Sequence, residues 1–372
     1  MARHSWQERE ERWGDLHGLT AATRRLQDIE MHLGQVRIKL REISRWADHL
    51  LERLSRPGLV NESLREKPPS AAWGDVLALL RESDWRFCNL ECVISDLLPE
   101  RLPAKVFHFR SDARNVAVLR AAGIDTVSCA NNHSLDYGPA AMLDMLRLLE
   151  VAGVGHAGAG ADLEQASRAA ISTTRDGTRI AVLACTDNEP GWAAGADSSG
   201  IWYVPADPAR PEARLLLHRV SSASRLADIV VVSLHWGSNW GRRPEAGHPE
   251  LARALVGAGA DLIFGHSSHV FRGVGLHLGV PIIYAAGDFI DDYGISEAER
   301  NNWSLLHVLE MAQPTRRLHL HPTVIDRMRA RLAHGEEAAT ILSVMASLCS
   351  ELGTSVRQAG DELLIELEPR AR

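Results

Sequence analysis

Short, continuously apolar runs that alternate with helical patterns limit the folds open to residues 60–292. Such runs predict strands that are covered on both faces, because a half-exposed strand alternates apolar and polar side chains. Regular alternation of strand and helix predicts an α/β core. The expected strands are "RFCNLECVI", "IDTVSCANNH", "TRIAVLACTD", "ADIVVVSLHWG", "ADLIFGHSSH" and "VPIIYAAGDF", and the expected helices are "NVAVLRAAG", "PAAMLDMLRLLEVAG" and "HPELARALVGAG".

The two ends of the chain have other patterns. Residues 303–325 predict a hairpin, and a helix near 336–352 and a strand "DELLIEL" follow it. Residues 1–55 predict a helix that ends at Pro57 and Gly58 and could pair with itself or a partner, because its apolar residues keep a seven-residue repeat. We therefore expect a helical segment at 1–55, a core domain at 56–325 and a completing helix and strand at 326–372. The repeat comprises Leu26, Ile29, Leu33, Val36, Leu40, Ile43, Ala47, Leu50 and Leu54.

Composition excludes several partner classes. The net charge is −7 and no basic stripe accompanies aromatic residues, which argues against nucleic acid. No apolar run approaches the ~20 residues of a membrane span. The five cysteines are odd in number and form no Cys-x-x-Cys pair, which is typical of reduced thiols in the cytoplasm.

Polar side chains gather where the expected strands end. Ligands of open α/β sheets bind beyond the carboxyl ends of the strands, so these side chains should lie together. Imidazole, carboxylate and amide oxygen together suit a divalent metal, and two such ions can promote attack on a phosphoester. Each residue alone fits an ordinary structural role, but together they predict a metal or phosphate site. They are Asn89, Glu91, Asn131, Asn132, His133, His235, His266 and His269. His319 and His321 lack this context and are expected to be structural or exposed.

Five stretches resemble the capsule A (CapA-like, poly-γ-glutamate biosynthesis) proteins in order and spacing. The resemblance covers about residues 59–322 and implies the four-layer α/β sandwich of the calcineurin-like metallophosphatases. The stretches are "NLECVISD", "VSCANNHSLDYG", "VVVSLHWGSNW", "GADLIFGHSSHVFRGV" and "IIYAAGDF".

The resemblance also implies roles for single residues. Glu91 would bridge two ions of manganese, zinc or iron. Asn132, His235 and His266 would bind one ion, and His269 would face the other. His133 would act as proton donor, oriented by Asp136, on an anionic small molecule or polymer. Substrate-binding candidates are Asn89, Lys105, Arg110 and Trp236, although Trp236, like Trp192, Trp202 and Trp240, could equally be packed in the interior.

One family feature is missing from the sequence. The family opens with a strand that ends in Gly-Asp-x-Met, whose Asp binds the first metal. Gly74-Asp75 predicts a helix start instead. Three explanations stand: a reading-frame slip or mis-set start that makes residues 1–54 foreign, a genuine replacement of the strand by a helix, or substitution by a carboxylate such as Asp48. Without that Asp, the first metal keeps only Glu91 and His269, so one ion or two could bind.

Three functional hypotheses follow. The first is a metal-dependent hydrolase of a phosphoester or a related anionic bond. The second is a non-catalytic accessory or binding protein with a degenerate metal site. The third is a defective gene product without function. A further departure, Asp288 where the family commonly has Asn, adds negative charge beside Asp291 and Asp292.

Overall fold

The computed structural model describes residues 59–368 except 106, 293 and 312–315. The helix expected within residues 1–55, and with it Asp48, lies outside the described residues. Within the described part, no helix is both long enough and apolar enough to cross a bilayer. The α/β class predicted from the sequence is confirmed.

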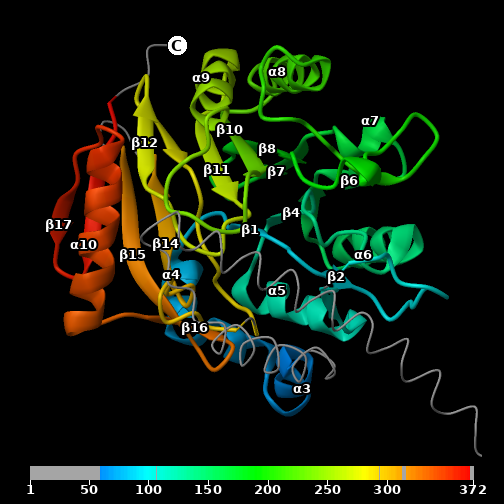
Figure 1. Cartoon of the computed structure of the whole chain (residues 1–372), viewed down its shortest axis with the longest axis horizontal. Coiled ribbons are helices and arrows are strands. Elements are labelled where there is room, and N and C mark those ends of the chain that lie inside the picture. The colour runs from blue at the N-terminus through cyan, green and yellow to red at the C-terminus, as the bar shows by residue number, and fades with distance from the viewer. Residues whose placement is uncertain (1–58, 106, 293, 312–315, 369–372) are drawn as a thin grey trace, which may run out of the picture. The chain divides into compact units, whose positions relative to one another are not determined.

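The largest sheet has six strands in the order β12-β13-β11-β10-β8-β7 (Figure 1). Its four inner strands are parallel, and its edge strands β12 and β7 pair antiparallel. Helices α8 (Pro211–Ala223) and α9 (His248–Ala258) pack their apolar sides against it. β8 and β10 are buried almost throughout, which accounts for their continuous hydrophobicity. The strands are β7 (Ala170–Thr173), β8 (Arg179–Thr186), β10 (Ile229–His235), β11 (Leu262–His266), β12 (Val274–His277) and β13 (Val280–Ile283).

A second, three-stranded sheet is entirely parallel, in the order β1-β4-β5. The apolar faces of helices α5 (Val116–Ala122) and α6 (Gly138–Val151) pack against this sheet. The strand expected over residues 86–94 is divided, because β1 ends at Asn89 and a separate short strand β2 starts at Val93. The elements of this region are β1 (Phe87–Asn89), β2 (Val93–Ile94), β3 (Arg110–Ser111), β4 (Thr126–Ser128), β5 (Gly155–Ala157), β6 (Ala159–Gly160), α7 (Leu163–Ala166) and β9 (Gly200–Ile201).

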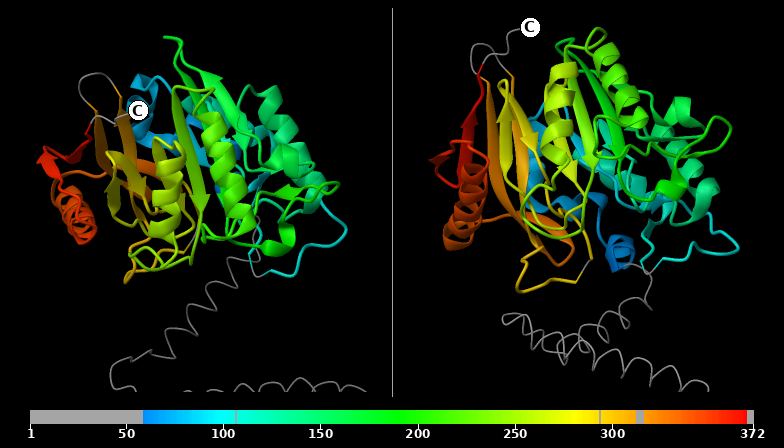
Figure 2. Two further views of the ribbon diagram at one scale, coloured as in Figure 1. Left: turned by 90° about the horizontal axis from the view of Figure 1, so that it is seen from above. Right: turned by 45° about the horizontal axis from the view of Figure 1, so that its top comes forward.

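A third, antiparallel sheet is formed by the C-terminal part of the chain (Figure 2). The expected hairpin is present, with β14 paired to β15 from Trp303–Val324 to Glu310–Arg317. The sheet order is β14-β15-β18-β17, and α10 packs against it and against β12. The elements are β14 (Trp303–Glu310), β15 (Arg317–Asp326), β16 (Arg329–Leu332), α10 (Gly335–Glu351), β17 (Arg357–Ala359) and β18 (Glu362–Glu366).

The first described helices attach to this C-terminal sheet. The 3₁₀ segment η1 (Pro69–Val76) lies between α3 (Leu59–Glu66) and α4 (Leu77–Glu82) and contacts β16. Gly74 has φ +49°, and a Cβ there would lie 2.1 Å from the carbonyl oxygen of Ala330, so only glycine fits. Asp75 Oδ1 accepts a hydrogen bond of 2.8 Å from the Leu332 amide. Asp75 therefore has a structural partner in β16.

Candidate metal centre

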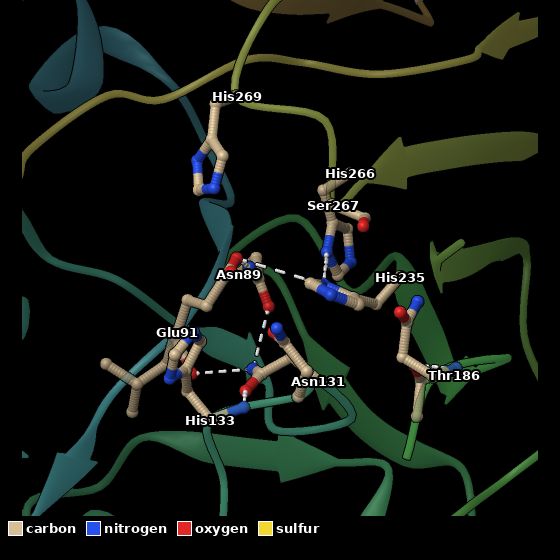
Figure 3. Close-up of polar contacts among 12 residues, drawn as sticks. Asn89, Glu91, Asn131, His133, Thr186, His235, His266, Ser267 and His269 are labelled. Carbon is tan, nitrogen blue, oxygen red and sulfur yellow. Dashed lines mark hydrogen bonds and ion pairs between the residues drawn. The ribbon is translucent and has the colours of Figure 1, made fainter. Parts of the chain in front are cut away.

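The predicted site residues come from two different sheets. Glu91 follows β1 of the three-stranded sheet, whereas His235 and His266 end the neighbouring parallel strands β10 and β11 of the six-stranded sheet. His235 and His266 are direct register partners, so their side chains leave the sheet together. One ligand atom from each of these three residues lies within 4.8 Å of the others. Figure 3 shows the group at the point where the strand ends meet.

The two histidines face each other through their Nδ1 atoms, which are 3.0 Å apart. Ser233 Oγ lies 2.8 Å from His266 Nε2 and holds that ring from behind. Burial lowers the pKa of His266 to about 3 and lowers that of His235 well below its usual value. Both imidazoles are therefore neutral near pH 7, which is the form that binds metals.

Glu91 is positioned by a network of asparagines. Asn89 Nδ2 donates to Glu91 Oε2 at 2.8 Å, and Asn131 Nδ2 donates to Asn89 Oδ1 at 3.1 Å. Glu91 Oε2 lies 3.8 Å from His235 Nδ1. Burial raises the pKa of Glu91 to about 7, against the opposing effects of His269, Asn89 and Lys105. A nearby cation would stabilise the deprotonated, charged form of such a carboxyl group.

The donor set fits a divalent ion by three observations. Two nitrogens that are each about 2.0–2.1 Å from one zinc ion can be no more than about 4.2 Å apart, and 3.0 Å satisfies this limit. Among the described residues, the buried Asn132 Oδ1 has no hydrogen-bond partner. Two imidazoles, a carboxylate and an amide oxygen are ligands that zinc, manganese and iron accept.

His133 lies beside this group and is fixed from two sides. Its Nδ1 is 2.5 Å from Asp136 Oδ2, and its ring stacks on Phe109 with 3.9 Å between centroids. Asp136 is completely buried, and it also accepts from the Phe109 amide at 2.7 Å and pairs with Lys105 Nζ at 2.8 Å. Lys105 Nζ also donates to the Asn132 carbonyl and lies 4.6 Å above the Trp192 ring. With Nδ1 engaged by Asp136, Nε2 is the nitrogen of His133 left for other contacts.

His269 approaches the group from a different direction. Its Nδ1 lies 2.9 Å and 3.2 Å from the two carboxylate oxygens of Asp288, and its ring is 5.4 Å from that of Trp240. Figure 3 shows its imidazole pointing toward Asn89 and Glu91 from the side away from His133. Burial raises the pKa of both Asp288 and Asp291 well above the usual value. A carboxylate on Nδ1 of a histidine orients Nε2 for ligation.

The backbone between His266 and His269 is unusual. Ser267 has φ +103°, a conformation that non-glycine residues rarely adopt, and its hydroxyl donates to the Gly237 carbonyl at 3.1 Å. At Gly265, a Cβ would lie 2.4 Å from the Tyr284 carbonyl oxygen. Strained backbone of this kind concentrates at functional sites, where the surrounding structure holds it in place.

Comparison with known proteins assigns the family. The model of the family "Bacterial capsule synthesis protein PGA_cap" matches residues 48–293. The chain belongs to this family. The "Probable polyglutamine synthesis accessory protein Rv0574c" of Mycobacterium tuberculosis is 33% identical over 312 residues, which cover 80% of this chain and 81% of that protein.

Two proteins of bacilli are less similar relatives. The "PGA biosynthesis protein CapA" of Bacillus subtilis is 31% identical over 63% of this chain and 60% of its own length. The "Capsule biosynthesis protein CapA" of Bacillus anthracis is 29% identical over 58% of this chain and 52% of its own length. The resemblance expected from the sequence motifs is thereby confirmed.

Two of the residues expected to bind substrate, Arg110 and Trp236, make contacts within the protein. Arg110 donates to the Ser95 carbonyl at 2.7 Å and pairs with Asp112 at 3.3 Å, which ties β3 to its neighbours. Trp236 is only 2% exposed, stacks on His248 and donates to the Tyr284 carbonyl at 2.9 Å. The structure therefore places Trp236 in the core, which was the second of the two interpretations open for this residue.

Asn89, also expected to bind substrate, donates a hydrogen bond to Glu91. Sequence reasoning missed Ser233 and Phe109, which support His266 and His133. A signal for Ser233 was present, because side chains two residues apart on a strand lie on the same face and Ser233 precedes His235 by two.

Proposed function

We propose that this capsule synthesis family member is a metal-dependent hydrolase of a phosphoester or a related anionic bond. The observation that carries the proposal is the meeting of Glu91, His235 and His266 within 4.8 Å, beside a histidine that is held by a buried carboxylate. Nothing in an ordinary core requires neutral imidazoles and a carboxyl group to converge at the ends of strands from two sheets.

In this proposal Glu91, Asn132, His235 and His266 hold one divalent ion of manganese, zinc or iron. His269, oriented by Asp288, faces a second position that Glu91 also reaches. A divalent ion bound here supplies Lewis acidity toward an anionic oxygen and activates water as a nucleophile. The absent Gly-Asp carboxylate makes the second position the weaker of the two, and Asp288 adds a carboxylate on that side.

The chain's own residues handle the proton and the substrate charge. His133 would donate a proton from Nε2 to the leaving group in its charged form; burial lowers the pKa of His133, and Asp136 at Nδ1 opposes this effect. Stacking on Phe109 prevents the ring from turning away. Lys105 places a positive charge next to Asp136 and Asn132, where it can attract an anionic substrate.

Poly-γ-glutamate or capsule production is the pathway we propose, because the names of two relatives refer to PGA biosynthesis and to capsule biosynthesis. An anionic polymer or a small anionic intermediate is the corresponding substrate class. The second candidate is a non-catalytic accessory role with a degenerate metal site. The lack of the family's Gly-Asp ligand among the described residues favours this candidate, and so does the name of the mycobacterial relative.

We also propose that the described part forms the four-layer sandwich of the metallophosphatases. In this arrangement residues 56–325 are the family domain and residues 326–372 complete it. Support comes from the pairing of β18 with β15 and from the packing of α10 on the same sheet. The helical segment at 1–55 remains a separate proposal, with self-association as its expected role.

Metal analysis and turnover test the proposal together. The full chain, purified without chelator, should retain metal at this centre and hydrolyse bis(p-nitrophenyl) phosphate or p-nitrophenyl phosphate with added manganese. His235→Ala should retain about one equivalent of metal less than the wild type and should lose turnover. The matched control His277→Ala changes a histidine at the end of the edge strand β12 and should keep both. Retained metal without turnover on either ester would favour the accessory role, and metal-free protein without a manganese response would refute the metal centre.

A further inference from the structure

A second group of metal-binding side chains lies on the C-terminal sheet. His319 and His321 alternate on β15 with the buried Leu318 and Leu320, so both imidazoles project from the opposite face to the core. β18 pairs antiparallel with β15, with Leu320 opposite Leu363. This register brings Glu362, the first residue of β18, next to His321.

The three side chains converge on one carboxylate oxygen. His319 Nδ1 is 3.0 Å and His321 Nε2 is 3.5 Å from Glu362 Oε2. One ligand atom from each residue lies within 4.8 Å of the others, as in the group around His235. The two rings are almost parallel, with an interplanar angle of 11° and 6.1 Å between centroids. Each of the three side chains is between 21% and 23% exposed, so an ion could enter from solvent.

A fourth residue supports one of these histidines from behind. Glu310, at the end of β14, places Oε2 at 3.5 Å from His319 Nε2. A carboxylate on the outer nitrogen draws the imidazole proton there and leaves the lone pair on Nδ1, the nitrogen that faces Glu362. Nearby, Arg317 pairs with Glu366 at 3.0 Å, so its charge is already balanced.

We propose that His319, His321 and Glu362 form a second divalent-cation site with a preference for zinc. Two imidazoles and one carboxylate are a ligand set that zinc accepts, with solvent as the remaining ligand. The ion would join β15 to β18 and so fasten the last strand of the chain to its sheet. This inference does not depend on the proposed hydrolase activity, because the group shares no residue with the centre at His235.

Zinc titration of the full chain in two backgrounds tests the site. The first background is the His235→Ala variant, which removes a ligand of the other centre, and the second adds His319→Gln and His321→Gln to it. After removal of metal with chelator, we expect the first protein to bind one equivalent of zinc and its unfolding temperature to rise with zinc. The second protein should lose that equivalent and show no zinc-dependent rise. Glu310→Gln should weaken zinc binding by about 10-fold to 100-fold, as is typical for outer carboxylate partners of ligand histidines.

A matched control lies nearby in the same domain. His334 is exposed, and its Nδ1 lies 3.6 Å from Asp361 Oδ2. His334→Gln, placed in the His235→Ala background, should leave zinc binding unchanged. Equal zinc binding with and without His319 and His321 would overturn the proposal. Failure of the His235→Ala protein to bind any zinc would also overturn it, and would mean that Glu362 serves only as an ion-pair partner of the two histidines.

Discussion

The buried imidazole of His248 should make the stability of the protein depend on pH. His248 begins α9, is 1% exposed, and stacks on Trp236 with 4.2 Å between ring centroids. Its Nδ1 accepts a hydrogen bond of 3.3 Å from the Glu245 amide. Burial, with a smaller effect of Arg272, lowers the pKa of His248 to about 4 from an ordinary value of 6.5. The folded protein therefore resists protonation at a site that the unfolded chain protonates readily.

The sign and size of the effect follow from linkage. Between pH 6.5 and pH 4 the unfolded state binds a proton that the folded state does not, so stability is full above pH 6.5 and falls as the pH decreases. For these two pKa values the loss from His248 is about 2 kcal/mol between pH 7 and pH 5, and about 3 kcal/mol by pH 4.

Urea unfolding followed by tryptophan fluorescence at pH 7 and pH 5 measures this loss. His248→Asn keeps an acceptor for the Glu245 amide but removes the titrating ring, so its loss on acidification should be smaller than that of the wild type by about 2 kcal/mol. His218→Asn, at an exposed position of α8, should behave like the wild type. An equal loss in the wild type and in His248→Asn would refute the assignment of this pH dependence to His248.

Three further substitutions test other parts of the structure. Gly265→Ala should lower the unfolding free energy by about 1–3 kcal/mol, because the new methyl group would collide with the Tyr284 carbonyl; an unchanged melting temperature would contradict this. Asp136→Asn should cost about 3–5 kcal/mol in urea unfolding, since it removes the carboxylate between Lys105 and His133, and a cost below 1 kcal/mol would argue against a charged Asp136. Asp288→Asn should weaken manganese binding at the His269 position by about 10-fold to 100-fold, measured in a titration that resolves two equivalents. Equal affinity in the wild type and the variant would show that Asp288 does not orient His269.

The parallel strands of the core could be predicted from the sequence, because each of them is a continuous run of apolar residues. β8, β10 and β11 are apolar along their length, and α9 starts and stops at residues that favour helix ends. Helix α8 was missed although its buried residues Ala213, Leu216, Val220 and Ala223 follow helical spacing. Local sequence patterns do not show which parallel strands belong to which of the two sheets, because strand pairing depends on contacts between distant segments.

For the candidate metal centre, too, the sequence indicated the residues but not their surroundings. Strand-end position was enough to select Glu91, His235 and His266, which the structure brings together. The surroundings of Arg110 and Trp236 depend on packing that no local pattern reports. His319 and His321 were expected to be structural or exposed, and their partner Glu362 follows 41 residues after His321, so only the fold reveals the group.

The contact between η1 and β16 has a consequence for synthesis on the ribosome. Gly74 lies against the carbonyl of Ala330, and Asp75 binds the amide of Leu332, so the first described helices rest on a strand that is translated more than 250 residues later. During translation Trp73 can already pack against α5, whereas the side of this segment that faces β16 stays uncovered until that strand is made. Nascent chains that lack residues 329–332 should therefore expose this early segment to chaperones until synthesis is nearly finished.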